Sequence, residues 1–207
     1  MTDPSRKGHW EAVYSTKGEN EVSWFQENPA PSLELIALTR PTPQSAIVDI
    51  GGGASRLVDG LVADGFGKVT VLDLSEAALA SAKARLGDSG QSVRWVAADV
   101  TLWNPTQTYD IWHDRAAFHF LTEPSDRNAY VARLKQATAP GGHAIIGTFA
   151  LDGPEKCSGL PVNRYDATSL GAALGDGFEL IDTRRHEHAT PWNSMQRFQF
   201  CVFRRTA

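Results

Sequence analysis

Short apolar runs alternate with amphipathic segments along most of the chain. Five runs have the length and composition of strands: Ala46 to Ile50, Val69 to Leu72, Val93 to Ala97, Tyr109 to His113 and His143 to Phe149. Three segments between them carry apolar residues at helical spacing and charges on the other side: Arg56 to Asp64, Glu76 to Leu86 and Ser125 to Ala139. This alternation predicts an α/β fold in which helices cover both faces of a parallel sheet. Ser75 has the position of an N-cap for the second of these helices.

The pattern changes toward the end of the chain. Two further strand-like runs, Phe178 to Thr183 and Arg197 to Arg204, follow one another with no long helix between them. We therefore expect them to pair antiparallel at one edge of the sheet. In open sheets of this kind, ligands bind at the carboxyl ends of the strands, near the point where the strand order reverses.

Length and charge limit the function classes. The chain has 207 residues, of which 42% are hydrophobic, so it can bury one good core, and we expect a single domain over residues 1–207. The Pro-rich segment 40–43 indicates a joint between an N-terminal helical cap or lid (1–43) and a sheet core (44–207). A net charge of -4 argues against nucleic acid as the main substrate. We expect a cytoplasmic protein without a membrane partner, because no apolar run has transmembrane length.

Three consecutive glycines, Gly51 to Gly53, follow the first strand and precede a helix. Glycine permits a positive φ and lets a ligand approach the backbone, and the helix N-terminus presents free N–H groups. A dinucleotide fingerprint starting at Gly51 would require a third glycine at position 56, where Arg56 stands, so a pyrophosphate ligand does not fit. The next strand ends in Asp73, about 20 residues past the turn, as expected of a ribose-binding acid.

At this point the chain resembles class I S-adenosylmethionine-dependent methyltransferases of the small-molecule type. Four motifs match in order, and a Pro-Gly-Gly turn before the fifth strand also fits: Val48 to Gly53, Val71 to Ser75, Ala98 to Val100, Tyr109 to Asp114, and Pro140 to Gly142. The resemblance implies a Rossmann-like, seven-stranded, mostly parallel sheet whose last strand is antiparallel. It also implies S-adenosylmethionine as the cofactor, with no metal required.

The resemblance assigns roles to the residues at the strand ends. Gly51 and Gly53 would let the backbone approach the amino acid part of the cofactor, and Asp49 would orient that part. Asp73 would hold the ribose and Asp99 the adenine amino group, while the adenine would lie between Leu74 and Val100. Ser55 departs from the extended motif, which often has another glycine there. Taken singly, Asp49 or Asp73 could equally be a cap of a strand-to-helix junction.

Two aromatic segments near the N-terminus, His9 to Tyr14 and Glu21 to Gln26, resemble the first helix and lid of related enzymes. Such a lid would cover the sulfonium and exclude water. Trp24 is therefore a candidate for contact with the cofactor, through a cation–π interaction among others. The alternative, that Trp24 and its aromatic neighbours only hold the cap on the sheet, stays open.

Methyl transfer is an in-line displacement, so the protein must align the acceptor and, for a poor nucleophile, remove its proton. Asp114 and Arg115 resemble an acidic–basic pair found in small-molecule methyltransferases, including thiopurine ones. Asp114 is expected near the methionine end of the cofactor or the acceptor. Arg115 could hold an anionic acceptor or pair with Asp114. His119 is the candidate general base, because its ordinary pKa lies near neutrality, although it could also be a packed structural residue.

Three alternatives to a general small-molecule acceptor stay open. Cys157 lies in a Gly- and Pro-rich loop, a placement similar to that of a thiol in arsenite methyltransferases, so a thiol, selenite or arsenite could be the acceptor. Protein lysine methylation is a second alternative, although residues 114–117 depart from the Asp-Lys-Gly-Thr pattern of those enzymes. A cofactor-binding protein without catalysis is the third. The acceptor and the oligomeric state are not specified by the sequence.

Overall fold

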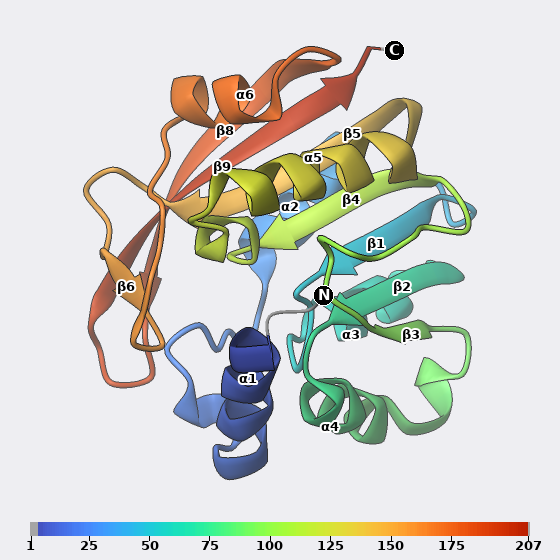
Figure 1. Ribbon diagram of the computed structural model, residues 1–207. Helices are drawn as coiled ribbons and strands as arrows, with labels where there is room; N and C mark the ends of the chain where they lie inside the picture. Colours follow the sequence, from blue (N-terminus) through green and yellow to red (C-terminus); the bar gives the residue numbers. More distant parts are fainter. Residues whose placement is uncertain (1–3, 207) are drawn as a thin grey trace.

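Seven strands form the central sheet of the computed structural model, which describes residues 4–206. They follow the order β3 (Arg94–Ala97), β2 (Lys68–Asp73), β1 (Ala46–Ile50), β4 (Tyr109–Arg115), β5 (Thr138–Phe149), β9 (Met195–Arg205) and β8 (Phe178–Ala189) (Figure 1). The strands from β1 to β5 are parallel, whereas β9 is antiparallel to both of its neighbours, β5 and β8. The predicted fold class, with its antiparallel last strand, is confirmed.

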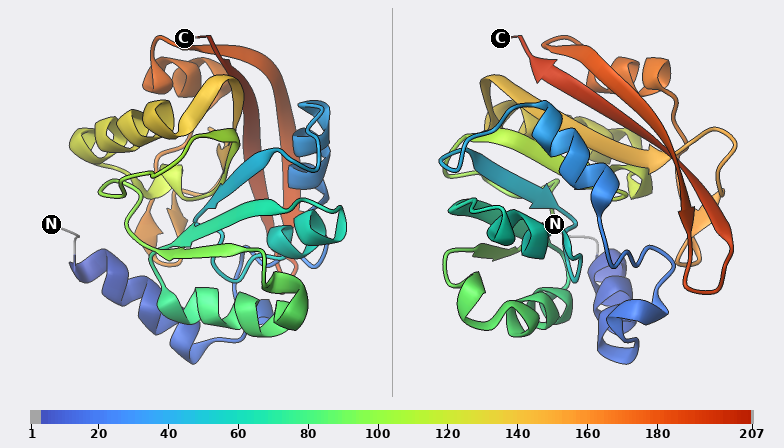
Figure 2. Two further views of the ribbon diagram at one scale, coloured as in Figure 1. Left: turned by 90° about the vertical axis from the view of Figure 1, so that its right-hand side faces the viewer. Right: turned by 180° about the vertical axis from the view of Figure 1, so that it is seen from behind.

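Helices cover both faces of this sheet (Figure 2). One face carries α5 (Pro124–Ala137) and α6 (Ala167–Leu174), and the other carries α2 (Ala30–Leu38), α3 (Leu57–Ala63) and α4 (Glu76–Leu86). Two separate apolar clusters result, because successive side chains of a strand point to opposite faces.

The carboxyl ends of three strands meet in the middle of the sheet. β1 pairs with β2 on one side and with β4 on the other, and the register places Ile50 beside both Leu72 and Asp114. Strand order therefore reverses at β1, which is where open α/β sheets bind their ligands.

The N-terminal segment crosses this edge of the sheet. α1 (Pro4–Thr16) lies beside α4 (Figures 1 and 2), and Glu11 accepts a hydrogen bond of 3.2 Å from the Ala77 N–H. The short helix η1 (Glu19–Glu21) follows. The expected cap of residues 1–43 thus contains two kinds of structure, because α2 belongs to a helical layer on the sheet and only the part before it covers the rim.

Several element boundaries differ from the predicted ones. α5 ends at Ala137, and the Pro-Gly-Gly segment forms a bulge inside β5, where Tyr109 pairs with Thr138 but Ile111 pairs with His143. β8 and β9 extend beyond their predicted ends, and α6 and the hairpin of β6 (Lys156–Cys157) and β7 (Leu160–Pro161) were not predicted. The N-cap at Ser75 is confirmed, since its side chain accepts from the Ala78 N–H at 3.1 Å.

Candidate active site

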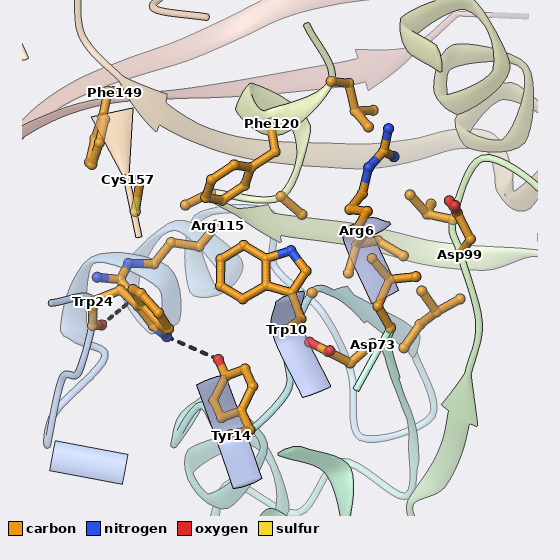
Figure 3. Close-up of a pocket in the computed structure, with 18 of the residues that line it drawn as sticks. Arg6, Trp10, Tyr14, Trp24, Asp73, Asp99, Arg115, Phe120, Phe149 and Cys157 are labelled. Atoms are coloured by element: carbon orange, nitrogen blue, oxygen red, sulfur yellow. Dashed lines mark hydrogen bonds between the residues drawn. The ribbon is translucent and has the colours of Figure 1, made fainter. Parts of the chain in front are cut away.

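A partly open cavity lies at the carboxyl ends of β1, β2 and β4 (Figure 3). Most of the predicted site residues line it: Trp24, Gly51, Asp73, Leu74, Asp99, Val100, Arg115 and Cys157. The other predicted residues are not among its lining residues, namely Asp49, Gly53, Asp114 and His119. Asp73 and Asp99 lie at one end and Arg115 at the other, with Trp10 and Phe120 between them (Figure 3).

The acidic end has the features expected of a nucleoside site. Asp73 is 7% exposed, its Oδ1 accepts from the Ser75 N–H at 2.8 Å, and burial raises its pKa to about 7. Gly53 has a φ of +41°, and a Cβ on it would lie 2.8 Å from Asp73 Oδ2, so only glycine leaves this carboxylate accessible. Asp99 accepts from both the backbone N–H and the hydroxyl of Thr101, at 2.9 and 2.7 Å.

Asp49 is buried behind the glycine turn in a chain of polar side chains. Its Oδ1 lies 2.7 Å from His113 Nδ1, and His113 Nε2 lies 2.8 Å from Ser32 Oγ. The order Ser-His-Asp is that of a hydrolase triad, but Ser32 is only 1% exposed and does not line the cavity, so it has no access to a substrate. The chain joins α2, β4 and β1 and holds Asp49 in place.

Asp114 supports the turn after β4. It accepts hydrogen bonds from the N–H groups of Ala117 and Phe118 at 2.8 and 3.1 Å, and from the Tyr130 hydroxyl at 2.6 Å. Burial raises its pKa to about 6. Within the described residues Asp114 has no contact with Arg115, so the two adjacent residues do not form the ion pair that was one of the expectations.

Arg115 extends into the other end of the cavity. Its Nη1 donates to the Trp24 carbonyl at 2.9 Å, and its guanidinium carbon lies 5.3 Å from the centre of the Phe198 ring. Its Nε and Nη2 are buried and have no hydrogen-bond partner. Burial lowers the pKa of Arg115 to about 10, so the side chain remains a cation at neutral pH.

His119 belongs to the packed interior. It is fully buried, its Nδ1 accepts from the Phe149 N–H at 3.3 Å, and its ring packs edge-on against Phe120 and Phe149. Burial lowers its pKa to about 3, so the imidazole is neutral at physiological pH. Because His119 does not line the cavity, it is not placed to remove a proton from an acceptor there.

Aromatic side chains close the cavity from the N-terminal side. The Trp24 indole N–H donates to the Tyr14 hydroxyl at 3.0 Å, and Trp10 packs edge-on against both Trp24 and Phe120, with ring centres 5.5 and 5.0 Å apart. The backbone of this segment is held by Arg115 and by His188, whose Nε2 lies 2.7 Å from the Ser23 carbonyl oxygen. The segment therefore covers one side of the cavity.

The C-terminal half contributes residues that the sequence analysis did not single out. Gln196 and Phe198 reach the cavity from the same face of β9, and Phe149 does so from the end of β5. No chemical motif marks these residues, and only the alternation within each strand could have placed them on one face. Cys157 is buried beside them, and burial raises its pKa to about 11, so it is a neutral thiol at physiological pH.

The described residues contain neither a cluster of metal-binding side chains nor a helix that could span a membrane. Across the described part of the chain, no three His, Cys, Asp or Glu side chains gather closely enough to bind a metal ion. None of the helices within residues 4–206 is long and apolar enough to cross a bilayer.

The strand order is that of the class I methyltransferase fold, and the glycine turn and the acidic residues lie at its successive strand ends. A family model described as a methyltransferase domain matches residues 47–142, slightly less than half of the chain. This segment is therefore similar to methyltransferase domains, and the fold agrees with that similarity.

Particular relatives were found by sequence and by structure. A malonyl-[acyl-carrier protein] O-methyltransferase from Anoxybacillus flavithermus is 29% identical over 109 residues, which are 52% of this chain and 40% of that protein. The N-methyltransferase NodS from Bradyrhizobium japonicum WM9, solved with S-adenosylhomocysteine, superposes with a TM-score of 0.72 at 16% identity, covering 95% of this chain and 98% of the other. A Burkholderia thailandensis 1,6-didemethyltoxoflavin-N1-methyltransferase has a TM-score of 0.70 at 21% identity, covering 98% and 85%. These structures support the fold, and they were solved with the demethylated cofactor bound.

Proposed function

We propose that this protein transfers a methyl group from S-adenosylmethionine to a small-molecule acceptor by in-line displacement. The observation that carries the proposal is the cavity, with an acidic end suited to a nucleoside and a separate aromatic end that contains Arg115. The net charge of -4 supports a small acceptor over a nucleic acid.

The residues at the acidic end fit the cofactor. Asp73 would accept hydrogen bonds from the ribose hydroxyls and Asp99 one from the adenine amino group, because both carboxylates line the cavity. Leu74 and Val100 supply apolar surface for the adenine. Gly51, with a φ of +66°, would let the backbone approach the methionine part. The cofactor supplies an electrophilic methyl group on a sulfonium.

The lid residues would exclude water and align the acceptor. Trp10, Trp24 and Phe120 pack against one another directly over the middle of the cavity. A dry, aromatic surrounding suits a sulfonium cation and prevents loss of the methyl group to water. We propose that residues 4–25 open for ligand exchange, since in the structure this segment covers the rim.

Labelled cofactor tests the proposal directly. S-Adenosylmethionine with a tritiated methyl group is incubated with panels of carboxylates, amines and thiols, and with selenite and arsenite, and transfer is measured. Calorimetry with S-adenosylmethionine and S-adenosylhomocysteine runs in parallel. Tight binding of both with transfer to at least one small molecule is expected. Tight binding without transfer to any acceptor would instead favour a non-catalytic cofactor-binding protein.

A further inference from the structure

The end of the cavity opposite the acids contains a cation, Arg115, that forms no direct ion pair among residues 4–206, although Asp49 attracts it from a longer distance. Arg115 donates one hydrogen bond, from Nη1 to the Trp24 carbonyl, while its Nε and Nη2 stay buried without partners. The acidic lining residues, Asp73 and Asp99, lie at the other end (Figure 3). A buried guanidinium with unused donors is unfavourable in the free protein, so a ligand that supplies acceptor oxygens would gain strongly from binding there.

The two unused donors have a specific geometry. Nε–H and Nη2–H lie on the same edge of the planar guanidinium and point in parallel directions. This edge matches the two oxygens of a carboxylate, which binds it through two parallel charge-assisted hydrogen bonds. The third nitrogen, Nη1, is already fixed to the lid backbone, and the Phe198 ring lies against the guanidinium. The remaining edge is unpaired but has almost no accessible surface, so a carboxylate would bind it after the side chains that cover it move.

The surroundings of Arg115 assign this end to the acceptor. The cofactor end is formed by Gly51, Asp73 and Asp99, which lie inside the family-matched segment 47–142. The walls near Arg115 come from outside that segment, from Trp24, Cys157 and Phe198, among others. Besides the guanidinium, the Tyr14 hydroxyl and the Gln196 amide are polar groups of this lining, and the other walls are apolar, so they suit a carboxylic acid with an apolar body.

Among residues 4–206, no titratable side chain that lines the cavity beside Arg115 is suited to remove a proton from an acceptor; His186 and His188 interact electrostatically with Arg115 but do not line the cavity. Tyr14 accepts from the Trp24 indole, and burial raises its pKa well above the ordinary value, while burial also raises the pKa of Cys157 to about 11. His119 is outside the cavity. An acceptor bound here must therefore arrive already deprotonated, as a carboxylate does at neutral pH.

We infer that the acceptor is a small carboxylic acid whose carboxylate binds the free edge of Arg115 and takes the methyl group, giving a methyl ester. The inference rests on the proposed function and specifies its substrate class. One carboxylate oxygen forms a bond to the methyl carbon, the bond from carbon to the sulfonium sulfur breaks, and its electron pair stays on sulfur. No proton is transferred, and the products are a neutral ester and a neutral thioether.

The binding test uses protein saturated with S-adenosylhomocysteine, titrated with phenylacetate and hexanoate and with their uncharged amides. At least one carboxylate is expected to bind ten times more tightly than its amide. Arg115→Met should remove this preference while changing the affinity for S-adenosylhomocysteine less than threefold. Arg115→Lys, which keeps the charge but lacks the paired donors, should retain only part of the preference. Arg133→Met is the matched control, because Arg133 lies on α5 and contacts Gln136 at an exposed site.

The product test uses S-adenosylmethionine with a deuterated methyl group and mass spectrometry of a carboxylic acid library. Labelled methyl esters are expected from the wild type, with at least a hundredfold loss in Arg115→Met. Circular dichroism checks that each variant is folded.

Three results would overturn the inference. Equal binding of carboxylates and amides would remove its basis. An equal loss of S-adenosylhomocysteine affinity in Arg115→Met would mean that Arg115 binds the carboxylate of the cofactor. Transfer to an amine or thiol, with none to carboxylates, would refute the inference and leave the proposed function standing, whereas binding without any transfer would refute the proposed function itself.

Discussion

Replacing Asp73 with asparagine separates what this carboxylate does for binding from what it does to stability. Burial raises the pKa of Asp73 from 3.8 to about 7, and the nearby Asp49 adds to the effect. The shift is about three pKa units, which corresponds to about 4 kcal/mol in the difference between the folded and unfolded states. Asparagine has nearly the same shape and can still accept the 2.8 Å hydrogen bond from the Ser75 N–H.

The pH dependence has a defined direction. Between about pH 4 and pH 7, the folded protein keeps a proton on Asp73 that the unfolded chain has released. Unfolding free energy therefore falls as the pH rises through this window, and the loss is complete above the folded-state pKa. Asp73→Asn cannot ionise, so it should be more stable than the wild type at pH 8, by up to about 4 kcal/mol. The difference should disappear near pH 4.

Urea unfolding of the ligand-free protein at several pH values measures this difference. Calorimetry measures the affinity of Asp73→Asn for S-adenosylmethionine. We expect a loss of roughly 10- to 100-fold, because a hydrogen bond to a charged group contributes about 1.5–3 kcal/mol. Asp64→Asn is a suitable control, because Asp64 is an exposed carboxylate at the end of α3, outside the cavity. A destabilised Asp73→Asn at pH 8, or a stability difference independent of pH, would refute the reasoning.

Three further predictions concern other parts of the site. His119→Ala should lower the unfolding free energy by about 2 kcal/mol or more, through loss of packing in the core, without changing the shape of the pH–rate profile. Loss of the acidic limb of that profile would instead show that His119 acts as a general base. Cys157→Ser should keep normal label transfer to the preferred acceptor, and abolished transfer would support a thiol-dependent reaction. Arg85 donates to the carbonyls of Ala54 and Ser55 beside the glycine turn, and it pairs with Glu19 of η1. Arg85→Met should therefore weaken S-adenosylmethionine binding at least threefold in calorimetry. Unchanged affinity would show that the turn is rigid without Arg85.

The acidic residues of the proposed cofactor end could be predicted from the sequence, because they lie at or near the ends of predicted strands. Asp73 and Asp99 each come directly after a strand-like run, and parallel strands bring their carboxyl ends to one edge of the sheet. The acceptor end was not predictable in this way. Gln196 and Phe198 reach the cavity from β9, which no motif connects to the other strands, whereas Tyr14 belongs to the aromatic segment that the resemblance marked as a lid.

Asp114 and Arg115 show why adjacency in sequence is a poor guide to contact. Both lie at the end of β4, where successive side chains point to opposite faces of the sheet. Asp114 faces Tyr130 on the α5 side, whereas Arg115 faces Trp24 and Phe198 on the other side. The strand geometry therefore excludes the ion pair that the dipeptide suggested, and among the described residues Arg115 forms no direct ion pair.

The charges of the two cavity ends also bear on the order of events. The sulfonium and Arg115 are both cations, so each disfavours the other in a partly open cavity with mostly apolar walls. A carboxylate between them would be attracted from both sides, and this attraction favours the approach of an acceptor oxygen to the methyl carbon. Methyl transfer neutralises the carboxylate of the acceptor and the sulfonium of the cofactor. Arg115 is then left beside a neutral ester, which accepts weaker hydrogen bonds than a carboxylate does. A cation fixed at this position would therefore stabilise the acceptor before transfer and bind the product less tightly afterwards.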